Sequence, residues 1–244
     1  MGGLDPRLAK VATAHALATT GLSVAHSLRV RGLRRTLLLA ALGTAVPVSG
    51  EYLAVNVLKQ LHHHVRPQVE GVPLAIALAW YNIVYGTFAA MEGILTATDP
   101  GEGNQSRTLA PATAAATSLD LLLDPAGLDL GLWQWSVAAP YAAEVEGANG
   151  KRGVPLLNFA GWIGLATGVV LAYQRLDPGA DVTGAAHAGL PGGAEAGRGA
   201  ALVLLSYYLP AAWALKRRRH KYLFYSAPFA VTLWAALKGR SGIS

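Results

Sequence analysis

Long apolar runs alternate with short polar connections along the chain, and this pattern predicts membrane-crossing helices. The apolar runs cover residues 8–28, 36–55, 71–95, 109–124, 153–173, 200–215 and 222–237. Several approach the roughly 20 residues that an α-helix needs to cross the hydrocarbon core of a bilayer. They are rich in Ala, Leu and Gly and lack the alternation of a barrel strand. We therefore expect an all-α, polytopic integral membrane bundle of about seven or eight transmembrane segments, forming a single membrane domain over residues 1–244.

Residues 128–141 leave the number of crossings open, because this segment could be interfacial, re-entrant or an eighth membrane segment. Basic clusters at residues 29–35 and 216–221 mark cytoplasmic ends by the positive-inside rule. Seven crossings would place the two clusters on opposite sides of the membrane, whereas eight would place both in the cytoplasm. The rule therefore favours an even number of crossings, with residues 29–35 cytoplasmic.

The polar connections are predicted at residues 59–70, 96–107 and 174–198. The last is rich in Gly and Ala, so we expect it to be mobile. The first carries His62, His63 and His64, but adjacent side chains point in different directions and a metal site needs converging ligands. We therefore expect a solvated loop that tolerates substitution, and no metal.

The run at residues 71–95 carries two stripes at helical spacing. One stripe contains aromatic side chains and a carboxylate, namely Tyr81, Tyr85, Phe88 and Glu92. The neighbouring stripe contains small residues, namely Asn82, Gly86, Ala90 and Gly93. Small residues allow two helix backbones to approach closely, so a second helix is expected to pack on this face.

Composition narrows the classes of function. Of the 244 residues, 52% are hydrophobic and only 14% are charged, and the mean hydropathy is +0.34. The absence of cysteine excludes disulfides, thiolate metal ligands and thiol nucleophiles. The net charge is +6, and the basic residues cluster beside the apolar runs. This position favours a membrane-flanking role over nucleic-acid binding. There is no nucleotide fingerprint, so we expect no cofactor held by a familiar motif.

Four carboxylates lie within or at the ends of apolar runs: Glu51, Glu92, Asp120 and Asp124. A spacing of four places Asp120 and Asp124 on one face of a helix, which Pro125 is expected to end. Two carboxylates close together in a low-dielectric site cannot both ionise easily, so they can supply a proton donor and an acceptor. The alternative interpretation is that each carboxylate pairs with an arginine or caps a helix.

Four segments, GEYLAV, GVPLAIALAW, LDLLLDPAGLDLGLWQW and GVPLLNFAGW, follow one another between residues 50 and 168. Their order and spacing resemble those of the carotenoid biosynthesis membrane proteins, the acyclic carotenoid hydratases of the bisanhydrobacterioruberin hydratase and γ-carotene hydratase type. Residues 59–64 and the stretch between Trp135 and Gly153 depart from the pattern of that family.

The resemblance implies a cofactor-independent hydro-lyase that adds water to the terminal C1–C2 double bond of an acyclic carotenoid and produces a tertiary alcohol. It also implies a multi-pass protein of the cell membrane, with membrane lipid and the carotenoid as partners. The expected catalytic residues are Asp120, Asp124, Glu51 and Glu92. The expected substrate-binding residues are aromatic side chains and one amide, namely Trp80, Tyr81, Tyr85, Trp133, Trp135, Asn158 and Trp162.

Two other classes of function remain open at this point. A small transporter or proton-coupled carrier could use the same intramembrane carboxylates, although the sequence shows no repeated half. A non-catalytic assembly factor of a pigment pathway would share the membrane character without the chemistry. The tryptophans Trp133 and Trp135 also fit a plainer role as anchors at the membrane interface.

Overall fold

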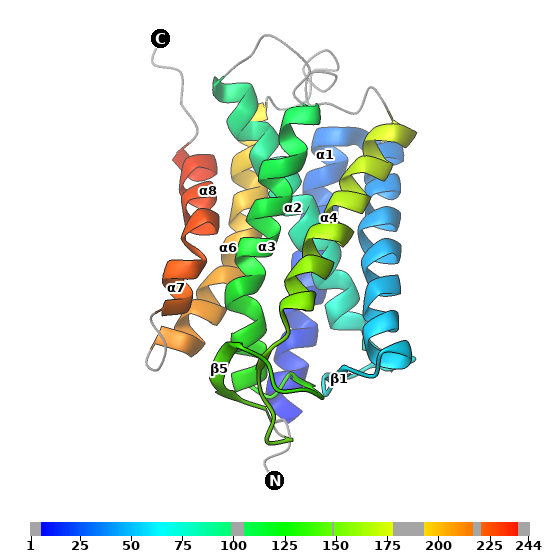
Figure 1. Ribbon diagram of the computed structural model, residues 1–244. Coiled ribbons are helices and arrows are strands. Elements are labelled where there is room, and N and C mark those ends of the chain that lie inside the picture. Colours follow the sequence, from blue (N-terminus) through cyan, green and yellow to red (C-terminus); the bar gives the residue numbers. More distant parts are fainter. Residues whose placement is uncertain (1–5, 99–104, 148, 178–192, 217–220, 239–244) are drawn as a thin grey trace.

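A computed structural model describes residues 6–98, 105–147, 149–177, 193–216 and 221–238, which form a helical bundle closed at one end by short strands (Figure 1). The helices are α1 (Pro6–Tyr52), the π-helix η1 (Leu53–Val57), α2 (Leu74–Thr98), α3 (Gln105–Asp129), α4 (Leu156–Leu176), α6 (Gly193–Lys216), α7 (Lys221–Tyr225) and α8 (Ala227–Lys238). The strands are β1 (Leu61–His63), β2 (Gln68–Val69), β3 (Val72–Pro73), β4 (Trp133–Trp135), β5 (Tyr141–Glu146) and β6 (Arg152–Val154). The predicted all-α class is therefore confirmed for the bundle.

Helix α1 consists of two antiparallel helices that meet at Gly32 (Figure 1). Gly32 has φ 75° and ψ 172°, a conformation that glycine adopts without the steric cost of a Cβ. The first leg, residues 6–31, and the second leg, residues 33–52 with η1, correspond to the first two predicted apolar runs. At the turn, Arg34 and Arg35 bind the carboxylate of Asp177 at 3.0 and 3.1 Å, which joins α1 to the end of α4.

Helix α2 lies at the centre of the bundle, and most of its residues between Trp80 and Gly93 are buried. Helix α6 packs on its stripe of small residues, as predicted. A Cβ at Gly86 would lie 2.8 Å from Cδ2 of Leu204, and a Cβ at Gly197 would lie 3.1 Å from the Cα of Gly93. These contacts leave no room for a larger side chain at the α2–α6 interface.

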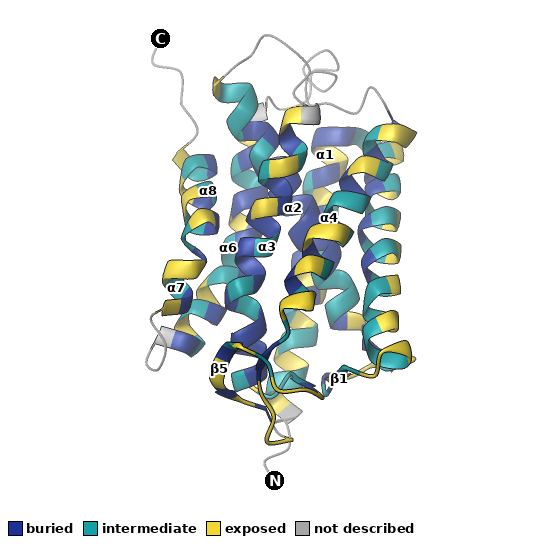
Figure 2. Ribbon diagram, viewed as in Figure 1, coloured by how far each residue is buried: buried dark blue, intermediate teal, exposed yellow. Residues whose placement is uncertain are grey.

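Exposed residues lie along the outer faces of the bundle helices (Figure 2), and many of them are large and apolar. Examples are Leu17, Leu37, Leu157, Ile163, Leu202, Trp213, Val231 and Trp234, which are between 51% and 68% exposed. Within the described residues, three helical segments are long and apolar enough to cross a membrane by length and composition, namely Arg7–Val57, Leu74–Thr98 and Leu156–Leu176. An apolar surface of this extent is typical of a protein that contacts lipid or a partner.

Residues 128–141 do not form an eighth membrane helix. After the end of α3 they contain strand β4 and the first residue of β5, at the end of the bundle where β1 also lies (Figure 1). The described legs are the two parts of α1, then α2, α3, α4, α6 and the α7–α8 pair. The turn of α1 and the end of α6 that precedes α7 lie toward opposite ends of the bundle (Figure 1). The even number of crossings that the basic clusters favoured is therefore not found in the described part of the chain.

The predicted loop at residues 174–198 is shorter than expected, because α4 extends to Leu176 and α6 already begins at Gly193. Residues 178–192, on which most of the expectation of mobility falls, lie outside the described residues. Residues 99–104 of the second predicted connection also lie outside them.

The close contact between α2 and α6 leads to a testable difference between two glycines. Gly86→Ala should lower the free energy of unfolding by about 1–3 kcal/mol, because the added Cβ overpacks against the buried Leu204. Gly164→Ala in α4 is the matched control, since a Cβ there meets nothing within 4 Å and alanine favours the helix. Thermal unfolding in detergent measures both variants, and an equal melting temperature for the two would contradict this packing.

Candidate active site

Two connecting segments pair with each other across the end of the bundle. Strand β1 runs antiparallel to β4, with Leu61 opposite Trp135 and His63 opposite Trp133. Backbone hydrogen bonds from the amide of His64 to Leu132 and from the amide of Ser136 to Gln60 extend this pairing. Alternate side chains of a strand point to opposite faces. Leu61 and His63 consequently face the bundle and are buried, whereas His62 between them is exposed.

Helix α3 brings two of the predicted carboxylates into this end of the bundle. Asp120 and Asp124 are 4% and 3% exposed and lie on one face, as their spacing predicts. The prediction that Pro125 ends the helix is wrong, because α3 continues to Asp129. A proline lacks an amide hydrogen and so leaves the carbonyl four residues earlier without its helical partner. That carbonyl, of Leu121, accepts a hydrogen bond of 2.6 Å from the hydroxyl of Tyr141.

The hairpin of β5 and β6 contacts α3 through Tyr141 and also binds α7 through Glu144. Glu144 of β5 accepts hydrogen bonds from the hydroxyl of Tyr222 at 2.5 Å and from Nζ of Lys221 at 2.8 Å. Desolvation acts to raise the pKa of Glu144, but these two donors outweigh it and lower the pKa to about 2. The hairpin is therefore joined to α7 by an ionised carboxylate at neutral pH.

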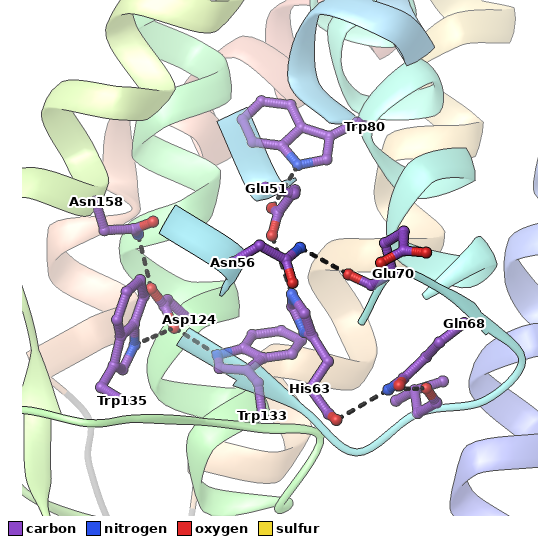
Figure 3. Close-up of polar contacts among 11 residues, drawn as sticks. Glu51, Asn56, His63, Gln68, Glu70, Trp80, Asp124, Trp133, Trp135 and Asn158 are labelled. Carbon is purple, nitrogen blue, oxygen red and sulfur yellow. Dashed lines mark hydrogen bonds and ion pairs between the residues drawn. The ribbon is translucent and has the colours of Figure 1, made fainter. Parts of the chain in front are cut away.

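Neutral N–H donors surround the aspartate pair, and Figure 3 shows those that contact Asp124. Nδ2 of Asn158 on α4 donates to Oδ2 of Asp120 and to Oδ2 of Asp124, at 2.7 Å in each case. Oδ1 of Asp124 also accepts from the indoles of Trp133 at 2.6 Å and Trp135 at 3.3 Å. Gly127 permits this arrangement, because a Cβ at that position would overlap the ring of Trp133. The two carboxylates thus converge on one amide group.

A third predicted carboxylate, Glu51 at the end of the second leg, faces the same site. Its Oε1 accepts a hydrogen bond of 2.8 Å from the indole of Trp80, and its Oε2 lies 3.0 Å from Nε2 of His63 (Figure 3). The indole of Trp80 stacks on that of Trp162, with ring centroids 3.6 Å apart. Helices α2 and α4 therefore present a pair of stacked aromatic rings beside the carboxylates.

His63 corrects the expectation of a solvated histidine loop. It is 5% exposed and contacts Glu51, so it belongs to the site that the sequence analysis assigned to other residues. The available signal was the alternation of buried and exposed positions that a strand shows. A strand of only three residues between polar neighbours is too short for this alternation to stand out in the sequence. Among the described residues, no group of three or more His, Asp or Glu side chains is arranged to hold a metal ion.

These side chains line one cavity of about 310 Å³ within the bundle. Glu51, His63, Asp120, Asp124 and Asn158 supply its polar wall, and Trp80, Trp133, Trp135 and Trp162 its aromatic wall. The rest of the lining is mainly aliphatic, from the first leg, α2, α3 and α6. The arrangement combines an apolar chamber with carboxylates that can give and accept a proton.

Three predicted site residues lie elsewhere. Glu92 forms a buried ion pair with Arg31 of the first leg, and Tyr81 and Tyr85 belong to the same region of α2. Arg31 also lies over the rings of Phe88 and Tyr173, at 5.0 and 5.8 Å from their centroids. None of Glu92, Tyr81 and Tyr85 lines the cavity. The alternative interpretation, a carboxylate paired with an arginine, describes Glu92.

A second group of polar residues lines the cavity and was missed in the sequence. Nε2 of His15 lies 3.1 Å from the hydroxyl of Ser206, and the His15 ring packs edge-on against Tyr207. The hydroxyl of Tyr207 in turn bonds Thr19 at 2.9 Å and accepts from Asn82 at 2.8 Å. No spacing in the sequence links these residues, because they come from the first leg, α2 and α6.

A family model described as carotenoid biosynthesis protein matches residues 10–190. The match contains the four segments on which the sequence resemblance was based, as well as both segments that depart from the family pattern. No curated protein and no solved structure matches the chain.

The two neighbouring histidines give a test of this geometry. His63→Ala should lower the free energy of unfolding by about 1–3 kcal/mol, because it leaves an oxygen of the half-buried Glu51 without its partner. His62→Ala should change it by less than about 0.5 kcal/mol, since that side chain is exposed. Thermal unfolding of the purified variants would show the difference. Equal stabilities would mean that the His63–Glu51 contact contributes nothing.

Proposed function

We propose that this chain, which belongs to the carotenoid biosynthesis protein family, adds water to the terminal C1–C2 double bond of an acyclic carotenoid and produces a tertiary alcohol. The observation that carries the proposal is the aspartate pair, Asp120 and Asp124, buried in a mainly apolar cavity. Hydration of an alkene begins with protonation of carbon, which needs a carboxylic acid held out of water beside an apolar substrate. The family supports a role in carotenoid biosynthesis, and the cavity chemistry favours hydration within that role.

The hydrogen bonds suggest different roles for the two aspartates. Asp124 accepts from three N–H groups, whereas within the described part of the chain the donor to Asp120 is Asn158 alone. Hydrogen bonds to a carboxylate favour its ionised form. We therefore assign the shared proton to Asp120, as the general acid, and the negative charge to Asp124. Since both converge on Asn158, the charge on Asp124 also opposes ionisation of Asp120.

The remaining site residues fit the later steps. The proton from Asp120 forms a C–H bond at C2 of the terminal double bond and leaves a tertiary cation at C1. The stacked faces of Trp80 and Trp162 can stabilise this cation. Water then adds to C1, and its extra proton passes to the Glu51–His63 pair. One water is consumed, no electron is transferred, and a proton returns to Asp120 before the next turnover.

We also propose that the protein is a multi-pass protein of the cell membrane. The apolar outer surface, the three long apolar helices and the antiparallel legs support this placement. A carotenoid dissolves in the hydrocarbon core of the bilayer, so an enzyme that acts on it gains access by lying there. The cavity would then open toward the strands at one end of the bundle, where water can reach it.

Asparagine substitutions test the catalytic roles. Asp120→Asn and Asp124→Asn should each reduce conversion of an acyclic carotenoid by about a hundredfold or more, because the amide cannot donate a carboxylic proton. The assay is pigment analysis of a lycopene-producing host, in which the wild-type chain should yield a more polar, hydroxylated product. Asp129→Asn is the matched control, since Asp129 lies on the same helix but does not line the cavity.

Two results would refute the proposal in different ways. Unchanged pigments with the wild-type chain and with each of several acyclic carotenoids would favour the carrier or the assembly factor. Full conversion by well-expressed Asp120→Asn and Asp124→Asn variants would show that the pair is structural.

Cysteine labelling tests the membrane arrangement, because the natural chain contains no cysteine. Val69→Cys and Arg152→Cys lie at the strand end of the bundle, and Arg34→Cys lies at the turn of α1 at the other end. In membranes, an impermeant maleimide should label the first two from one side and Arg34→Cys from the opposite side. Labelling of all three from a single side would exclude the arrangement.

A further inference from the structure

The cavity that holds the carboxylates reaches the outer surface of the bundle beside the first leg. Val11 of this leg lines the cavity and is also 63% exposed. Leu130 at the end of α3 is 37% exposed, and Pro210 of α6 is exposed as well, and both also line the cavity. These three residues, from the first leg, from the position that follows α3 and from α6, thus belong both to the lining and to the surface, and all three are apolar.

The carboxylates lie away from the three residues at this opening. Glu51 belongs to the second leg, and Asp120 and Asp124 on α3 precede Leu130 by ten and six residues. The first leg and α6 contribute His15, Ser206 and Tyr207 as their polar lining residues, and these side chains bond one another or their neighbours. An apolar molecule passing the opening would therefore meet aliphatic side chains first and ionisable ones only inside.

The size of the cavity limits what can enter. Its volume of about 310 Å³ lies at the lower end of the range for small-molecule sites. Along the first leg it extends from Leu8 to Ala16, which is about 12 Å at 1.5 Å per residue. A long linear polyene, comparable in length to the roughly 30 Å hydrocarbon core, cannot fit in this space. Only its end can lie inside, and the rest of the chain must pass out through an apolar opening.

We propose that the gap between the first leg and α6, bordered by Val11, Leu130 and Pro210, is the lateral entrance through which one end of a linear polyene reaches the carboxylates. This inference rests on the proposed hydration for the identity of the occupant. It deepens that proposal, because it predicts a substrate with a linear, ring-free apolar tail that remains outside the protein. The enzyme then modifies one chain end at each binding event.

A pair of tryptophan substitutions on one helix tests the entrance. Val11→Trp should obstruct the gap and reduce conversion of an acyclic carotenoid at least tenfold. Leu17→Trp is the matched control, because Leu17 is 52% exposed on the same leg but does not line the cavity. Its conversion should stay within twofold of wild type. Equal conversion by both variants, at equal amounts of protein in the membrane, would overturn the proposed entrance.

A second measurement is independent of catalysis and of the tolerance of the fold for tryptophan. Val11→Cys and Leu17→Cys each introduce a single thiol that a lipid-soluble maleimide can label in membranes. Lycopene-containing membranes should slow the labelling of Val11→Cys at least threefold relative to pigment-free membranes, and leave Leu17→Cys unchanged. Equal protection, or none, at the two positions would contradict the entrance.

The two proposals fail in distinguishable ways. Selective protection of Val11→Cys by lycopene in a chain that forms no hydroxylated pigment would support the entrance and refute hydration. Hydroxylated pigment from the wild-type chain, without selective protection and without an effect of Val11→Trp, would support hydration and refute the entrance.

Discussion

The cost of burying carboxylates in an apolar bundle is the constraint on which the rest of this structure depends. An ionised group removed from water must find a counter-charge, hydrogen-bond donors or a proton. The bundle uses different solutions in different places. Glu92 is paired with Arg31 beneath aromatic rings, which neutralises its charge. Asp120, Asp124 and Glu51 instead receive neutral N–H groups and a histidine, and they face a cavity. Only the second arrangement leaves a proton available for chemistry.

The connecting segments complete that second arrangement. Pairing of β1 with β4 places His63 and Trp133 side by side, so that each reaches a different carboxylate. Pro125 leaves a free carbonyl within α3, and Tyr141 from the β5–β6 hairpin binds it. Residues 59–64 and the stretch between Trp135 and Gly153, which are predicted to differ from the family pattern, are therefore structural parts of this end of the bundle. We expect differences in these segments among family members to alter the end of the cavity while the helices keep the carboxylates in place.

The cavity separates its tasks by element. The second leg, α3 and α4 carry the carboxylates and the amide, α2 and α4 carry the stacked indoles, and the first leg and α6 carry the aliphatic side of the chamber. Protonation of a hydrocarbon requires proton-carrying side chains on one wall and an apolar wall along which the substrate can lie. The His15–Ser206–Tyr207 group adds a polar spot whose side chains are bonded to one another and to Thr19 and Asn82. It joins three helices around the cavity and so fixes the width of the chamber.

The sequence by itself determined the helical class, the apolar runs and the family, because these depend on local composition and on spacings along one helix. It also identified Asp120 and Asp124 as a pair, since a spacing of four determines a shared face whatever surrounds it. It could not separate Glu51 from Glu92, because both are carboxylates near small residues in apolar runs. Only the packing of α1 against α2 places Arg31 beside Glu92, and only the pairing of β1 with β4 places His63 beside Glu51. The burial of His63, the course of α3 past Pro125 and the pairing of β1 with β4 were likewise decided by tertiary structure. Each depends on partners that are distant in the chain, and no local pattern encodes such contacts.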